Sequence, residues 1–196
     1  SGIDPSAIDD IIFAESHYGG GDLARYAADA TGMHDIPGQS VNRHCAGSLT
    51  AIGNASAQIG SGMERVLIAG GVPSLSMTPL TSQRIIGPEL KFEERWMPPT
   101  HVETPDAPAK DMSITVGWNT AQAVGITREE MDAWAARSHQ RAIAAMDAGK
   151  FVDEILPLKI QQLDGSVVDF SVDEHPRRDT TAEKLAALKV LHPEIE

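Results

Sequence analysis

The chain has 196 residues and is poor in cysteine and in aromatic side chains. It contains one cysteine, and aromatic residues make up 5% of the sequence. A single cysteine excludes an intramolecular disulfide and any metal site built from several cysteines, so a reducing compartment, the cytoplasm, is predicted. The seven histidines form no HxxxH or HxH pair. We therefore expect no metal site.

Basic charge and long apolar runs are also scarce. Lys and Arg number 16 against 28 Asp and Glu, which gives a formal net charge of −12. A surface this acidic argues against nucleic acid and anionic membranes as partners, because both attract basic patches. No apolar run approaches the roughly 20 residues that cross a bilayer. The first residues show no basic region followed by an apolar one, so we expect no secretory signal. The composition predicts an acidic, globular, cytoplasmic protein.

The first 72 residues predict an α/β fold. Residues 8–15 and 65–72 are largely apolar or β-branched and predict two strands. Residues 39–44, reached through the turn at Pro37 and Gly38, predict a strand between them, and an alanine-rich helix is expected over 23–31. Residues 44–63 contain no Asp, Glu, Lys or Arg. They predict a helix that is buried on most of its faces. Strand, helix and strand at this spacing imply a parallel sheet.

The rest of the chain differs in composition and in the elements that it predicts. Residues 73–109 hold seven prolines and predict a long surface excursion of the kind that forms interfaces. Residues 152–172 predict a hairpin that turns at residues 164–165.

Two capping boxes predict helices in this part. Thr127 and Glu130 begin a helix that Gly149 ends, and within it Trp134 is expected to pack into the core. Thr180 and Glu183 predict a last helix that runs to residue 189.

Cys45 lies where the second strand is expected to meet the uncharged helix. The N–H groups and dipole of a helix N-terminus lower the pKa of a thiol and favour the thiolate, the reactive form. Ala46 and Gly47 leave room for a substrate to approach the sulfur. A lone cysteine is more often a small buried apolar residue, and placement alone does not decide between these interpretations.

Several motifs in this sequence resemble those of the thiolase family. Residues 41–52 (V-N-R-H-C-A-G-S-L-T-A-I) are similar to its active-site segment, V-N-R-x-C followed by small residues and L-x-A. Residues 68–72 and Ser76 are similar to its I-A-G-G-x-E-S-M-S segment, and residues 126–157 and 173–189 are similar to two later runs. The order and spacing agree over nearly the whole chain. The resemblance therefore favours the catalytic interpretation of Cys45.

The resemblance implies a layered α/β/α domain, present in part, with a mostly parallel sheet and a buried central helix, plus an inserted α+β loop domain. Residues 1–78 would form the partial N-terminal domain with the nucleophile. Residues 79–196 would form the loop domain with oligomerisation and CoA-binding segments, and the C-terminal thiolase domain is not in this chain. The family's assemblies imply a homodimer or homotetramer.

The implied activity is that of an acetyl-CoA C-acyltransferase. It would cleave 3-ketoacyl-CoA by thiolysis, or run the reverse Claisen condensation, through an acyl-cysteine at Cys45. CoA and acetyl-CoA would be substrates, with no permanently bound cofactor. Met112 would line the pantetheine arm of CoA, or only fill a gap in a loop. Arg177 would meet the CoA nucleotide, or form with Arg178 a solvated pair that offsets nearby carboxylates. For His139, a helix-surface position is favoured.

The chain also departs from the family. Three further catalytic groups, the asparagine of N-E-A-F, the histidine of G-H-P and the second cysteine of C-x-G, are not in these residues. Pro73 stands where the family has glutamate. These departures favour an alternative: a non-catalytic thiolase-like subunit that binds acyl-CoA or serves as a scaffold.

Overall fold

The structure is a computed structural model that describes residues 2–16, 21–95, 101–107 and 112–191. It divides into two compact units, Ser1–Pro99 and Thr100–Glu196. Residues 79–99, which we assigned to the loop domain, cluster with the first unit. The assignment of domains at residues 78 and 79 stays a prediction.

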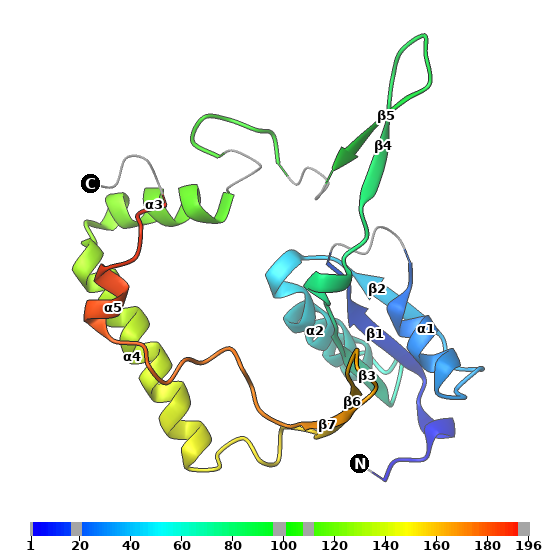
Figure 1. Cartoon of the computed structure of the whole chain (residues 1–196). Helices are drawn as coiled ribbons and strands as arrows, with labels where there is room; N and C mark the ends of the chain where they lie inside the picture. Colours follow the sequence, from blue (N-terminus) through cyan, green and yellow to red (C-terminus); the bar gives the residue numbers. More distant parts are fainter. Residues whose placement is uncertain (1, 17–20, 96–100, 108–111, 192–196) are drawn as a thin grey trace. The chain divides into compact units, whose positions relative to one another are not determined.

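The first unit is built on a three-stranded parallel sheet (Figure 1). After a short turn of 3-10 helix at Pro5–Ala7, the strands are β1 (Asp10–Ala14), β2 (Gly38–Val41) and β3 (Leu67–Gly71). They lie in the order β2–β1–β3 with both pairings parallel. This confirms the predicted strand, helix and strand arrangement, and it brings the carboxyl ends of the strands to one edge.

Helices cover both faces of this sheet. Neighbouring residues of a strand point to opposite faces. Ile11 packs against two alanines of α1 (Leu23–Ala30), and Ile12 packs against two alanines of α2 (Gly47–Gly60). Both isoleucines are buried. The result is the predicted α/β/α layering, with β1 at its centre.

The outer face of α2 corrects one prediction. We expected this uncharged helix to be buried on most faces, yet its buried residues are Gly47, Ala51 and Ala55, which recur every fourth position. Leu49 is 73% exposed and Ile52 is 53% exposed. The prediction was wrong for this unit, because the sheet covers one face of the helix and no other described residue of the first unit buries the opposite face.

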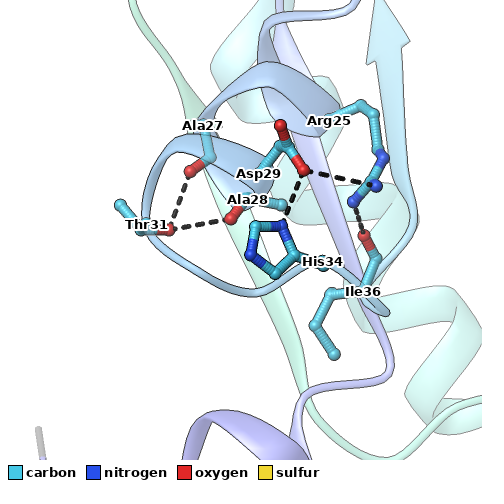
Figure 2. Close-up of polar contacts among 7 residues, drawn as sticks. All are labelled: Arg25, Ala27, Ala28, Asp29, Thr31, His34 and Ile36. Carbon is cyan, nitrogen blue, oxygen red and sulfur yellow. Dashed lines mark hydrogen bonds and ion pairs between the residues drawn. The ribbon is translucent and has the colours of Figure 1, made fainter.

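Polar contacts hold the end of α1 and the turn that follows it (Figure 2). Asp29 Oδ1 lies 2.8 Å from His34 Nδ1 and 3.8 Å from Arg25 Nη2. Arg25 Nη1 donates to the Ile36 carbonyl over 2.9 Å, and Thr31 Oγ1 donates to the Ala27 carbonyl over 2.7 Å. The hydrogen bond from His34 lowers the pKa of Asp29. These contacts fix the connection that leads into β2 and from there to Cys45.

Part of the proline-rich excursion is regular. A 3-10 turn at Leu75–Met77 is followed by an antiparallel hairpin of β4 (Thr81–Ile85) and β5 (Lys91–Arg95). The hairpin was not predicted. Several large apolar side chains are exposed on it or on its connecting loop: Ile85, Ile86, Leu90 and Phe92.

The second unit contains three helices and a hairpin among its described residues. They are α3 (Met112–Val124), α4 (Arg128–Asp147), β6 (Leu158–Gln161), β7 (Val167–Phe170) and α5 (Ala182–Ala186). The antiparallel β6–β7 pairing confirms the second predicted hairpin. The capping box of α4 is also confirmed, since Thr127 Oγ1 accepts from Glu130 N–H while the Glu130 carboxylate accepts from Thr127 N–H.

Three features of this unit differ from the predictions. Helix α3 was not predicted. The cap of α5 is Thr181, whose hydroxyl accepts from Lys184 N–H. The predicted box at Thr180 is therefore shifted by one residue, and α5 stops at Ala186. Trp134 is 67% exposed, with the Arg137 guanidinium 4.2 Å from its ring centroid, and does not pack into the core.

No helix in the described part of the chain combines the length and apolar character needed to cross a membrane.

Candidate active site at Cys45

Cys45 lies at the carboxyl edge of the sheet, just ahead of α2. After β2 the chain passes through a 3-10 turn at His44–Ala46 and enters α2, whose N-cap is Ala46. Cys45 is an exposed free cysteine. The N-cap residue of α2, Ala46, has no polar side-chain atom and makes no capping hydrogen bond to the first turn. The thiol is therefore open to solvent beside an uncapped helix N-terminus, as the sequence predicted for its position.

The residue before Cys45 has an unusual main chain. His44 has φ of 46°, and it is the one residue other than glycine with positive φ in the part of the chain that the structure describes. Its carbonyl accepts from Gly47 N–H and, over 3.4 Å, from the Ser16 hydroxyl. Its N–H donates to Asn42 Oδ1 over 3.1 Å. Left-handed backbone is costly for a side chain with a Cβ, and these bonds hold it in place.

Two glycines let α2 approach the sheet closely at this edge. A Cβ at Gly47 would lie 2.6 Å from Ala14 Cβ, and a Cβ at Gly71 would lie 2.8 Å from both Ala14 Cβ and Ser48 Oγ. Real Cβ atoms essentially never come this close to another heavy atom. The first turn of α2 is therefore packed between the carboxyl ends of β1 and β3, and this packing sets the position of Cys45.

A buried carboxylate, missed from the sequence, braces the same edge. Glu15 is 7% exposed at the end of β1, and its carboxylate accepts from Leu23 N–H at the start of α1. Its own N–H donates to the Val41 carbonyl over 3.0 Å. Asp22, the N-cap of α1, accepts from the Ser40 hydroxyl over 3.2 Å. A glutamate at the end of an apolar strand was the signal that could have singled out Glu15.

Met112 and Arg177, the two predicted CoA-contacting residues, belong to the second unit, whereas Cys45 belongs to the first. Met112 is the first residue of α3, and only its main chain is described. Arg177 is exposed on the segment between β7 and α5. Their roles toward CoA stay predictions.

The segment that carries Arg177 is tied to α4. Arg177 N–H donates to His139 Nδ1 over 3.0 Å. Arg178 forms a two-point ion pair with Asp147, at 2.6 and 2.9 Å, and its hydrogen bonds hold the pKa of Asp147 below the usual range. Thus Arg178 pairs with α4 and not with the carboxylates beside it in sequence.

Each end of α4 makes a further contact or borders a cavity. At the first turn of α4, Arg128 donates to the Leu185 carbonyl over 2.8 Å. At the other end, a mostly apolar cavity of about 400 Å³ lies beside Arg178, with Phe151, Ile155 and Val172 in its lining. No group of three or more His, Cys, Asp or Glu within the described ranges is arranged to hold a metal ion.

The fold and the cysteine together define a class: a thiolase-like α/β protein with a candidate nucleophile at the start of a helix over a parallel sheet. A family model described as "Thiolase, N-terminal domain" matches residues 1–193. The chain therefore belongs to the thiolase family and corresponds to its N-terminal domain.

Known relatives agree with this assignment. The chain is 34% identical to an acetyl-CoA acetyltransferase of Pseudomonas aeruginosa, over 96% of this chain and 49% of that protein. It is 37% identical to a beta-ketoadipyl-CoA thiolase of Acinetobacter baylyi, over 95% of this chain and 49% of that one. The crystal structure of the Bacillus anthracis acetyl-CoA acetyltransferase matches with a TM-score of 0.80 and 36% identity, over 96% of this chain and 48% of that chain. The chain spans about half the length of the relatives it matches.

Proposed function

We propose that this chain supplies the nucleophile of an acetyl-CoA C-acyltransferase that acts on 3-ketoacyl-CoA, with Cys45 as the acyl carrier. The observation that carries the proposal is the exposed thiol of Cys45 beside the uncapped start of α2. The family assignment and the acetyltransferases among the relatives support it.

The proposed reaction has two steps. The Cys45 thiolate attacks the ketone carbon of the 3-ketoacyl-CoA, the bond between that carbon and C2 breaks, and the acetyl-CoA carbanion takes a proton as it leaves. The thiolate of a second CoA then attacks the acyl-cysteine and releases acyl-CoA and the Cys45 thiolate. Reversal of both steps joins two acyl-CoA molecules. Negative charge that develops on the substrate oxygen needs N–H donors, and the start of α2 and the main chain near Gly71 are the candidates here.

The groups that would move protons in these steps are not among the 196 residues, since the asparagine, histidine and second cysteine motifs of the family are not in this sequence. The contribution that we assign to this chain is therefore acyl transfer to and from Cys45. A specific feature favours the second candidate, a non-catalytic acyl-CoA-binding or scaffold subunit: Pro73 stands two residues after Gly71, where the family has glutamate.

One experiment separates the two candidates. The complete protein is incubated with acetyl-CoA, and its mass is measured before and after, with the modified residue mapped in peptides. We expect one acetyl group on Cys45 and none in the Cys45→Ser variant under the same mapping. A protein that binds acetyl-CoA without ever acquiring the group would be the scaffold subunit, and the acyltransferase proposal would be wrong.

CoA recognition is assigned to the second unit. Met112 is proposed to lie against the pantetheine arm and Arg177 against a phosphate of the nucleotide. The exposed position of Arg177 and the family's use of CoA thioesters support this. Replacement of Arg177 by alanine is expected to weaken CoA binding in a calorimetric titration, and unchanged affinity would contradict its assignment.

The assembly is proposed to be a homodimer or homotetramer in the cytoplasm. The exposed apolar residues of the β4–β5 hairpin, among them Ile86, support self-association, because contiguous exposed apolar surface usually marks an interface. The single cysteine supports a reducing compartment.

A further inference from the structure

The neighbouring residues Arg177 and Arg178 are held in opposite ways. Arg178 is fixed through its side chain, by the two-point ion pair with Asp147 on α4. Arg177 is fixed through its main chain, by the hydrogen bond of its N–H to His139 on the same helix. Within the described ranges, the Arg177 guanidinium makes no hydrogen bond or ion pair, and its charge contributes only the smallest of the effects that lower the pKa of Asp179. One arginine therefore stabilises the fold, and the other is presented to solvent.

His139 is well suited to hold this main-chain position. Its ring is partly buried and lies in the middle of α4, so it is carried by the longest helix described. It lies 11 residues after Arg128, which is about three helical turns, so both point to the same side of the helix. Because Nδ1 accepts the Arg177 N–H over 3.0 Å, the ring proton belongs on Nε2. The bond joins residues 38 positions apart.

We infer that His139 is a positioning residue for CoA binding: its Nδ1 fixes the main chain of Arg177 so that the guanidinium is aimed at a phosphate of the CoA nucleotide. The inference rests on the role of Arg177 in the proposed function. A guanidinium matches a phosphate through parallel N–H donors, and this geometry is lost if the stem swings. Fixing the main chain in advance removes part of the ordering cost of binding.

Three variants in the complete protein test the inference. His139→Asn keeps an acceptor oxygen where Nδ1 was, His139→Ala removes the acceptor, and Arg177→Ala removes the guanidinium. Gln140→Ala, at the exposed neighbouring position of α4, is the matched control. Calorimetry measures affinity for CoA and for pantetheine, which lacks the phosphates, and hydrogen exchange measures protection of the Arg177 amide.

We expect Arg177→Ala to weaken CoA binding about tenfold or more and to leave pantetheine unaffected. His139→Ala is expected to weaken CoA binding about two- to tenfold and to speed exchange at the Arg177 amide. His139→Asn and Gln140→Ala are expected to match the unaltered protein in both measurements. Because His139 acts through Arg177, the double variant is expected to bind CoA no more weakly than Arg177→Ala alone.

Two kinds of failure are distinguishable. If Arg177→Ala weakens CoA binding but His139→Ala does not, or if His139→Ala weakens it further in the Arg177→Ala background, the positioning role is wrong while the proposed function stands. If Arg177→Ala leaves CoA affinity unchanged, the assignment of Arg177 to CoA is wrong and the inference falls with it, even where the amide exchange shows that the hydrogen bond exists.

Discussion

Replacement of Gly47 by alanine is expected to displace Cys45 without touching its chemistry. The new Cβ would lie 2.6 Å from Ala14 Cβ, whereas ordinary contacts lie at 3.4–4 Å. The first turn of α2 must therefore move away from β1 by roughly 1 Å. Overpacking of this kind costs about 1–3 kcal/mol of stability. A shift of about 1 Å in a reacting group costs about 100-fold in rate.

The assay pairs urea unfolding with the rate of Cys45 acylation by acetyl-CoA, followed by mass. Gly53→Ala on the same helix is the control, because a Cβ there meets nothing within 4 Å. It is expected to raise stability by up to about 1 kcal/mol, since alanine is the better helix former, and to leave the acylation rate unchanged.

A compensating variant makes the test of Gly47 sharper. Ala14→Gly removes the methyl group that Gly47→Ala would strike, so the double variant is expected to recover most of the lost acylation rate. A Gly47→Ala protein with normal stability and normal acylation would refute the reasoning. So would a double variant that stays as slow as the single one.

Three further predictions concern separate parts of the first unit. Asp9 accepts from the N–H groups of Val66 and Arg65, and these hydrogen bonds lower its pKa below the ordinary 3.8. The stabilising effect of the ionised carboxylate is therefore present above that value and is lost as the pH falls through the lower pKa of the folded state. Asp9→Asn is expected to reduce the pH dependence of the free energy of unfolding, measured by urea titrations from about pH 2 to about pH 6, the range over which such carboxylates titrate. His44→Val is expected to be less stable than His44→Asn by about 1 kcal/mol or more, because asparagine tolerates left-handed backbone and β-branched residues do not; equal unfolding midpoints would contradict this. Ile86 is fully exposed in the loop of the β4–β5 hairpin. The Ile86→Glu variant is expected to form smaller assemblies, seen as a lower assembly mass in sedimentation. An unchanged mass would show that the hairpin is not part of the interface.

The parallel sheet could be predicted from sequence because its strands carry their own signal. Residues 8–15 and 65–72 each contain a short run without charged residues, at 11–14 and 66–72, as strands buried on both faces require. The capping box of α4 was equally legible, since Thr127 and Glu130 satisfy each other within one turn of helix. In both cases the residues that determine the structure are neighbours in sequence.

Other elements depend on information that a local pattern does not carry. Helix α3 begins at Met112, and its third to fifth residues, Ile114, Thr115 and Val116, are all β-branched. β-Branched residues have low helix propensity, so the sequence did not indicate a helix here. The β4–β5 hairpin has polar residues on both faces, so its sequence lacks the alternation of apolar and polar residues that indicates a strand. For α5, adjacent threonines offered two caps one residue apart, and the extended backbone of Thr181 selects between them.

At the candidate site, the sequence indicated which residue but not what holds it. Cys45 was singled out by its motif, and its exposed position ahead of α2 agrees with that prediction. The hydrogen bonds from Leu23 N–H to the Glu15 carboxylate and from Arg177 N–H to His139 were not foreseen, because each depends on how separate elements approach one another. His139 was expected to be an ordinary surface histidine, and a histidine facing solvent and one accepting a main-chain N–H have the same sequence signature.

Gly47, Ala51 and Ala55 form a row of small residues on the face of α2 that is buried against the sheet. Their size sets the distance between the helix and the sheet, to within about one methyl group. Any larger side chain in this row would lift the helix, and Cys45 with it, away from the sheet. Leu49 and Ile52, on the outward side, carry no such constraint from the layer below. Changes of side-chain volume intended to reshape the surroundings of the thiol therefore belong on the outward side of the helix, where bulk can be varied while the height of the sulfur above the sheet is kept.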